Sequence, residues 1–326
     1  MSVHQALHKD SRYRPWELAV WLLAFAAPAL VPQHALIVNE VAIVALFAVS
    51  LDLILGYTGI VSLGHAAFLG FGAYTAALFA KHVMPDPMVG LVVAMVAATL
   101  LGTICSLTIM RGSDLTRLMV TLGVALILME LANKLDWLTG GADGLQGVSM
   151  GSVLGRFEFD LLGQTAAWYS LSVLLVLFWL ARHLIHSPFG ATLKAVRDNP
   201  LRATAIGVSV PSRLALSYTI AAGVAGVAGA LMAQTTGFAS LDVFALERSA
   251  DVMLMLVIGG VGWLYGGLAG AVVFKLMHDV ISGITPQYWT FWIGLFLVLL
   301  VLVGRQKLMR PWTWFGKFGK SSGGQS

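Results

Sequence analysis

Charged side chains are scarce in this sequence. Asp, Glu, Lys and Arg make up 11% of the 326 residues, whereas soluble domains carry about 25%. Hydrophobic residues make up 58% of the chain. A chain with so few charges cannot cover a water-facing surface, so the composition indicates an integral membrane protein.

Cysteine is almost absent as well. The single cysteine, Cys105, excludes an internal disulfide, offers no metal cluster and lies in an apolar run. Two catalytic patterns are also missing. The sequence has no H-E-x-x-H zinc motif, and Trp314 stands where a nucleotide-binding loop ending in Gly319-Lys320-Ser321 needs its first glycine. We therefore expect neither an intramembrane enzyme nor an ATPase in this chain.

Basic residues exceed acidic ones, with a net charge of +4, and cluster at both ends and in one internal loop. This clustering is a topology signal and does not indicate nucleic-acid binding. If every basic segment is cytoplasmic, both termini, Arg111 and loop 182–213 lie inside the cell. Loop 134–163, in which acidic residues outnumber basic ones, then lies outside.

Apolar runs of membrane-spanning length follow one another along the chain and predict an all-α polytopic helix bundle. The expected segments are 18–31, 36–55, 61–80, 89–110, 115–133, 164–181, 214–234, two short segments within 249–281, and 287–304. About ten crossings (the range is 8–10) return the basic tail to the cytoplasm, whereas nine would place it outside. The first run also fits a signal peptide. We favour a retained helix, because cleavage would make the mature chain begin inside the next hydrophobic segment.

The sequence thus predicts one transmembrane domain over residues 16–304, with cytoplasmic tails at 1–15 and 305–326. Within it, residues 56–80 are apolar, crowded with small residues and carry one ionisable group near the centre, His65. Ser62, Ala66 and Gly70 recur every four positions, so a helix over 61–80 would have one face nearly free of side chains. Such a face lets another backbone approach closely in lipid. We expect this helix to be the central packing element, near the solute path.

A second glycine-rich stretch lies within 252–274, which contains no charged residue. Gly262, Gly266 and Gly270 are four positions apart, and Gly259 and Gly260 precede them. Glycine-interrupted apolar runs can be broken helices that line a cavity. This pattern is the reason for expecting two segments over 249–281.

Residues 187–213 are too polar to span a membrane and too long for a simple turn. Ser187 and Pro188 can start a helix there, and a broken apolar stripe of Leu193, Val196, Leu201 and Ile206 follows. From the residues alone, such a helix fits equally well a cleft on another protein or a layer of anionic lipid headgroups.

Several motifs resemble, in order, those of the permease family of branched-chain amino acid ABC transporters. Residues 56–74 resemble the family signature, and residues 138–145 together with Arg111-Gly112 and Thr121-Leu122-Gly123 resemble its next conserved region. Residues 187–208 resemble its cytoplasmic segment and residues 257–262 its late glycine-rich motif. The resemblance covers about residues 36–303. It is strongest to the second permease of that system, whose relatives include urea and short-amide permeases.

The resemblance implies a heteromeric importer in a prokaryotic cell membrane. Its other parts would be a second permease forming a heterodimer, two ATP-binding subunits that hold ATP and Mg²⁺, and an extracytoplasmic solute-binding protein. This chain itself would hold no cofactor and no metal. The resemblance also makes 187–213 the coupling element that receives motion from the ATPase, with the following residues: Gly190, Ala195, Arg197, Asp198, Asn199 and Gly207. Pro200 replaces an acidic residue usual in the family, and we expect it to shorten or kink the coupling helix.

Candidates for the translocation path or for helix packing are Gly56, Gly59, Ser62, Gly64, His65, Gly70, Glu130, Gly259 and Gly260. His65 either contacts the solute or is a buried histidine bonded to a neighbouring carbonyl. Asp52 and Glu130 lie in or near apolar spans, where ionisable groups usually face a bundle interior or a water-filled cavity. The last candidate is an outer loop formed by Thr139, Gly140, Gly141, Asp143 and Gly144. It contacts the binding protein or lines the outer entrance, or it is an ordinary tight loop.

The function expected from these observations is half of the translocation path of an ATP-driven importer for branched-chain amino acids or related small polar solutes. A urea or short-amide permease is the alternative within the same family. An ion-coupled secondary transporter is a rival from another class. It would need buried paired carboxylates, for which Asp52 and Glu130 are the candidates.

Overall fold

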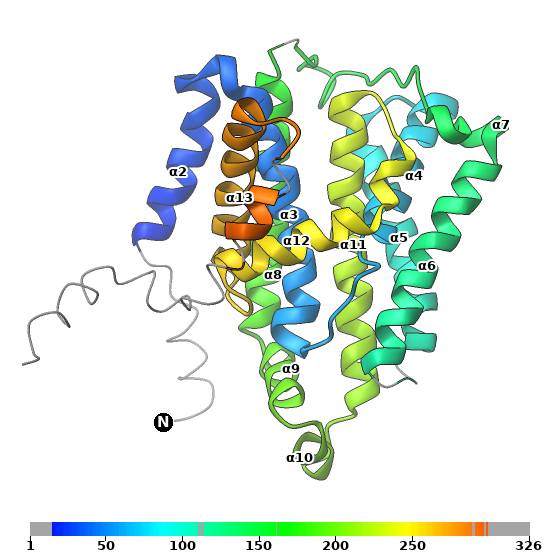
Figure 1. The fold of residues 1–326 in the computed structure, drawn as a ribbon, viewed down its shortest axis with the longest axis vertical. Coiled ribbons are helices and arrows are strands. Elements are labelled where there is room, and N and C mark those ends of the chain that lie inside the picture. The colour runs from blue at the N-terminus through cyan, green and yellow to red at the C-terminus, as the bar shows by residue number, and fades with distance from the viewer. Residues whose placement is uncertain are drawn as a thin grey trace, which may run out of the picture.

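The computed structural model describes residues 15–109, 112, 114–160, 162–288, 291–296 and 298. The regular structure of this part of the chain is helical, and it forms a bundle (Figure 1). The long elements are α2 (Pro15–Leu30), α3 (Ala35–Thr58), α4 (Ala66–His82), α5 (Pro87–Ile109), α6 (Asp114–Lys134), α8 (Gln164–Ile185), α11 (Val210–Thr236), α12 (Leu246–Gly259) and α13 (Leu264–Ile284). The short elements are η1 (Pro32–His34), α7 (Asp136–Thr139), η2 (Gly141–Asp143), α9 (Pro188–Asp198), α10 (Pro200–Ala205) and η3 (Leu241–Phe244).

Six helices of the described part are long and apolar enough to cross a membrane: α3 with η1, α5, α6, α8, α11 and α13. The all-α polytopic bundle expected from the sequence is therefore confirmed. The N-terminal tail 1–15, Arg111, most of segment 287–304 and the tail 305–326 lie outside the described residues, apart from Pro15.

Helices α3 and α11 form the centre of the bundle and are mostly buried. Their polar groups find partners there. Ser217 Oγ donates to Leu53 O at 3.1 Å, and Asn39 Nδ2 donates to Thr235 Oγ1 at 3.1 Å. Because lipid offers no hydrogen bonds, such internal partners stabilise polar side chains at this depth.

Helix α4 packs against α11 through small residues. A Cβ on Gly72 would overlap the backbone of Gly226, and one on Gly229 would overlap the carbonyl of Leu69. This close backbone approach is what small residues permit between helices in lipid. The expected close packing of the 56–80 stretch is therefore present, although the residues that provide it are different from the predicted face.

The helix predicted over 61–80 begins five residues later than expected, at Ala66. Helix α3 continues to Thr58, Gly59 adopts a left-handed conformation with φ of 78°, and α4 starts only at Ala66. Ser62 therefore lies in a non-helical segment, and the atoms nearest to a Cβ on Gly70 belong to the ring of Phe244. Hydropathy alone does not separate a continuous span from a broken one, which explains the error.

The run 249–281 forms two segments, as predicted. Helix α12 is short and crosses the middle of the bundle obliquely, and α13 turns back beside α2 (Figure 1). The break lies at residues 260–263, where Gly260 and Gly262 have φ values of 109° and 78°. Glycine tolerates these angles because it has no Cβ.

The two ends of the bundle carry different short elements (Figure 1). Helices α9 and α10 lie at one end, which we call the α9 end. Helix α7 and the loop that follows it lie at the opposite end, which we call the α7 end. The sequence predicts that the basic loop and the acidic loop lie on opposite sides of the membrane. In the fold these two segments lie at opposite ends of the bundle.

Candidate functional site: the junction of α9 with two helix breaks

One side chain of α9 reaches both glycine-rich motifs. Arg197 Nη1 donates to the carbonyl oxygen of Gly56 at 2.6 Å. Its Cγ lies 3.3 Å from the position of a Cβ on Gly59, and its Nη1 lies 3.2 Å from that of a Cβ on Gly262. Arg197 therefore contacts the end of α3 and the break between α12 and α13 at the same time.

A buried carboxylate joins the same two breaks. The backbone N–H of Gly262 donates to Asp52 Oδ1 at 2.7 Å, and the Asp52 side chain is fully buried. A Cβ on Gly56 would overlap that carboxylate oxygen. Hydrogen bonds to charged groups are stronger than neutral ones, so Asp52 fixes the α12–α13 turn against α3. We call Asp52, Gly56, Arg197 and Gly262 the junction.

Local sequence signals define the start of α9 and its packing. Ser187 caps it, because its Oγ accepts from the N–H of Gly190 at 3.5 Å, and Pro188 occupies the first helical position. A Cβ on Gly190 would overlap the carbonyl of Ile185, so this glycine permits α9 to pack on the end of α8. Leu193 and Val196 are buried and anchor α9 to the bundle.

Pro200 divides the segment as expected. Helix α9 ends at Asp198, Asn199 is extended with φ of −160°, and α10 begins at Pro200. Asn199 Oδ1 then accepts from the N–H of Arg202 at 2.9 Å and caps α10. Ala195 is half-buried in α9, and Gly207 follows α10 with φ of 87°.

The broken apolar stripe predicted from the sequence does not form one apolar face. Leu193 and Val196 face the bundle, whereas Leu201 is 85% exposed and Ile206 is 72% exposed. The extended residue Asn199 changes the direction of the chain between α9 and α10. The two halves of the stripe therefore do not share a face. The exposed half gives the α9 end two large apolar side chains. Asp198 is exposed at the same end and pairs with Arg197 at 3.3 Å.

His65 lies at the end of the non-helical segment and is fully buried. Ser50 Oγ donates to Phe47 O at 2.6 Å, so the 2.8 Å contact between Ser50 Oγ and His65 Nε2 requires the imidazole to donate. The His65 ring stacks on Phe47 at 5.3 Å between ring centroids. Its Nδ1 has no hydrogen-bond partner among the described residues. The hydrogen-bond partner of the His65 ring is therefore the Ser50 hydroxyl, whereas the sequence suggested a neighbouring carbonyl.

The remaining small residues of the two motifs serve close packing. Cβ atoms on Gly64 and Gly259 would overlap the carbonyls of Thr121 and Gly266, respectively. The start of α4 is also tied to α12, because Ala66 N donates to Ser249 Oγ at 2.9 Å. The segment before α4 is therefore held by α6 on one side and by α12 on the other.

Glu130 lies on the surface of α6 in an exposed ion pair with Lys134 at 3.6 Å. Asp52 and Glu130 therefore have different partners in this structure and do not form a carboxylate pair. Among the described residues, no group of three or more His, Cys, Asp and Glu residues could hold a metal ion.

The loop at the α7 end is a hydrogen-bonded turn. Thr139 Oγ1 donates to Leu135 O at 2.8 Å, and Leu145 N donates to Ala239 O at 2.8 Å. A Cβ on Gly144 would lie 2.7 Å from Ala239 O. Gly140 and Gly141 have positive φ angles, and Asp143 is exposed at the surface of the turn.

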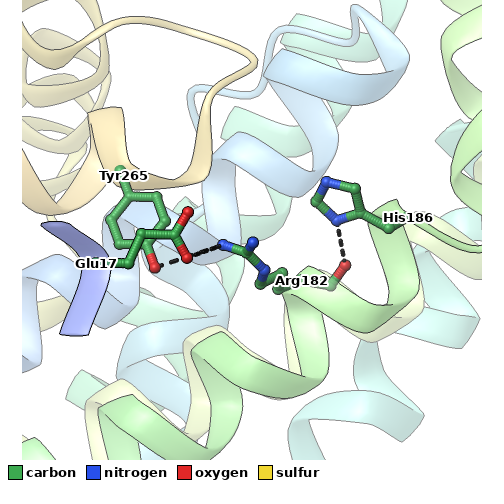
Figure 2. A network of polar contacts seen from close by, with 4 residues as sticks. All are labelled: Glu17, Arg182, His186 and Tyr265. Atoms are coloured by element: carbon green, nitrogen blue, oxygen red, sulfur yellow. Dashed lines mark hydrogen bonds and ion pairs between the residues drawn. The ribbon is translucent and has the colours of Figure 1, made fainter. Parts of the chain in front are cut away.

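Sequence reasoning missed a buried polar network that joins three helices (Figure 2). Arg182 Nη1 of α8 donates to Glu17 Oε2 of α2 at 2.7 Å and lies 3.5 Å from Tyr265 Oη of α13. His186, one turn further along, donates its Nδ1–H to Arg182 O at 2.8 Å. The available signal was Glu17, a carboxylate at the edge of an apolar run, since such groups usually have a partner.

Comparison with known proteins agrees with this architecture. The family model described as "branched-chain amino acid transport system / permease component" matches residues 35–303. No solved structure matches the chain.

Two relatives are high-affinity branched-chain amino acid transport system permease proteins LivM. The protein of Escherichia coli is 25% identical over 316 residues, and that of Salmonella typhimurium is 27% identical over 321 residues. Each alignment covers 90% of this chain and 74% of the relative. An autoinducer 2 import system permease protein LsrC of Yersinia pseudotuberculosis is 27% identical over 249 residues, covering 74% of this chain and 65% of the relative. The chain therefore belongs to the family of permease components of branched-chain amino acid transport systems.

Proposed function

We propose that this permease component forms half of the translocation path of an ATP-driven importer for branched-chain amino acids or related small polar solutes. The other half would come from a second permease. Two ATP-binding subunits would dock at the α9 end, in the cytoplasm, and a solute-binding protein at the α7 end, outside. The termini would then be cytoplasmic.

The observation that carries the proposal is the reach of Arg197 from α9 to Gly56 and Gly262. Helix α9 lies at an end of the bundle, where a partner can push on it, while the Arg197 side chain contacts two places where helices are broken. Broken helices line substrate sites in many transporters. Movement of α9 would therefore shift both breaks together.

Coupling of this kind needs each state of the transporter to bind its ligand differently. The junction provides a discrete element for such a switch, because its contacts are specific hydrogen bonds that are either made or broken. ATP-driven closure of the partner subunits would move α9, and the path would change the side to which it opens. The chain would supply no bond chemistry of its own.

The proposal is tested by replacing Arg197 and Asp198 together with alanine in the complete transporter reconstituted in vesicles. Membrane insertion and basal ATP hydrolysis should persist, whereas solute uptake per ATP hydrolysed should fall at least about tenfold, a loss of about 1.4 kcal/mol of coupling. Lys134→Ala, at the α7 end, serves as the control and should leave uptake unchanged. Normal uptake in the double variant would overturn the proposal.

The relatives named above carry names for different solutes, so the scaffold is compatible with more than one. We propose branched-chain amino acids because the relatives with the greater coverage bear that name. Uptake of labelled leucine, isoleucine and valine by the reconstituted system, with urea and acetamide as competitors, tests this choice. Uptake of labelled urea or acetamide, with no uptake of leucine, would favour the short-amide alternative.

A further inference from the structure

A cavity of about 250 Å³ opens at the α9 end, between the start of α2, the end of α8, α9 and the α12–α13 turn. Its wall contains the polar network of Figure 2 and adds two tryptophans and a lysine, Trp16, Trp263 and Lys194. It lies directly beside the junction, because Gly262 also lines it.

The charges on the cavity wall leave a positive surplus. On the cavity wall, Arg182 is neutralised by Glu17 at 2.7 Å. Behind Gly262, outside the wall, Arg197 pairs with Asp198 at 3.3 Å, and the Asp52 carboxylate accepts from the Gly262 N–H. Lys194 has no carboxylate within ion-pair distance among the described residues, and its Nζ lies 5.8 Å from the centroid of the Tyr57 ring. A cation with only an aromatic face beside it can still accept an anionic partner.

His186 also lines the cavity and has one ring nitrogen available to it. The Nδ1–H of His186 donates to the carbonyl oxygen of Arg182. Nε2 is therefore the ring nitrogen available to a group bound in the cavity. The imidazole could donate from Nε2 to an anion only in its protonated form.

The surroundings of the mouth favour a lipid over a free anion. The rings of Trp16 and Trp263 lie 6.4 Å apart, and both residues are partly exposed. Tryptophan is enriched where membrane meets water. Helix α2 stands at the outside of the bundle, and beyond the mouth it exposes Leu18, Leu22 and Leu23. A free phosphate would gain nothing from contact with this apolar face, whereas the acyl chains of a lipid can lie along it.

We propose that the cavity binds the phosphate headgroup of an anionic phospholipid of the inner leaflet, with its acyl chains along α2. Basic pockets between transmembrane helices at the cytoplasmic side favour such headgroups. The leaflet assignment rests on the orientation given under the proposed function. A lipid bound there contacts α2, α9 and the α12–α13 turn together, so membrane composition would influence the position of the coupling helix.

The test is native mass spectrometry of the assembled transporter, purified in detergent and supplied with equal amounts of phosphatidylglycerol and phosphatidylethanolamine. Wild type should retain phosphatidylglycerol in preference, and Lys194→Gln should lower that retention about fivefold, the effect of one basic residue at an anionic surface. Lys194→Arg should restore it, and Lys134→Gln, at the α7 end, should leave it unchanged.

Three results would overturn the proposal: equal retention of both lipids by wild type, unchanged retention in Lys194→Gln, or displacement of the lipid by millimolar inorganic phosphate. The last result would identify a free-anion site. The assay contains neither ATP nor solute. A loss of coupled uptake would therefore count against the proposed function only, and a loss of lipid preference against the cavity only.

Discussion

Arg197 and Gly56 are 141 residues apart in the chain, yet the guanidinium donates to the carbonyl oxygen at 2.6 Å. This contact links a helix at the end of the bundle to the last turn of the buried helix α3. Gly262 completes the arrangement, since its N–H binds Asp52 one turn earlier on α3.

Gly262→Ala should abolish most of the uptake. Gly262 has φ of 78°, a conformation that costs a residue with a Cβ about 1–2 kcal/mol, and the new methyl group would lie 3.2 Å from Arg197 Nη1 and from Gly56 O. Uptake by reconstituted vesicles measures the effect. Gly283→Ala in α13 is the matched control, because a Cβ there meets no atom of the described residues within 4 Å. Equal activity of the two variants would contradict the role of the turn.

Asp52→Asn should be tolerated far better than Asp52→Leu. Asparagine keeps an oxygen that can accept from Gly262 N, whereas leucine leaves that N–H without its partner at a cost of about 1–3 kcal/mol. The thermal unfolding midpoint of the purified complex, compared between the two variants, measures this difference. If the two variants unfolded at the same temperature, the hydrogen bond would have no structural importance.

The Glu17–Arg182 pair should behave as a coupled unit. Removing one partner of a buried ion pair costs about 3–5 kcal/mol, because the other charge stays buried without compensation. Both residues are buried, and their atoms lie 2.7 Å apart. We expect Glu17→Met and Arg182→Met each to destabilise the protein strongly and the double variant to be more stable than their sum implies. Additive losses of stability would show that the pair is not coupled.

Gly229→Ala should weaken the packing of α4 on α11. A Cβ there would overlap the carbonyl of Leu69, so the helices must move apart, and overpacking of this kind costs about 1–3 kcal/mol. Gly123→Ala in α6 is the control, because within the described part of the chain a Cβ at that position has no neighbour within 4 Å. A reduced unfolding temperature is expected for the first variant only.

The sequence predicted the helices well because hydropathy reports directly on burial in lipid. Runs such as 89–110 and 214–234 differ from α5 and α11 by only a few residues. The break before α4 escaped prediction, because residues 59–65 are as apolar and small as the helices on either side. Pro200 had a clear local effect, since a proline disfavours helix at the residue before it.

The junction could not be predicted in the same way. Arg197 was identified from a motif, but its contact with Gly56 depends on how α9 packs against α3, which no local pattern encodes. Leu201 and Ile206 show the same limit. Their helical spacing relative to Leu193 and Val196 suggested one face, and a single extended residue, Asn199, separated them.

Docking of the ATP-binding subunits at the α9 end is the central claim, and site-directed cross-linking tests it most directly. The single cysteine, Cys105, is buried and can be replaced by alanine. New cysteines at Leu201, 85% exposed on α10, and at Trp137, 78% exposed on α7, then carry a photoreactive group in the assembled transporter. We predict that the group at position 201 cross-links to an ATP-binding subunit and that the group at position 137 does not. A cross-link to that subunit from position 137, with none from position 201, would contradict the account.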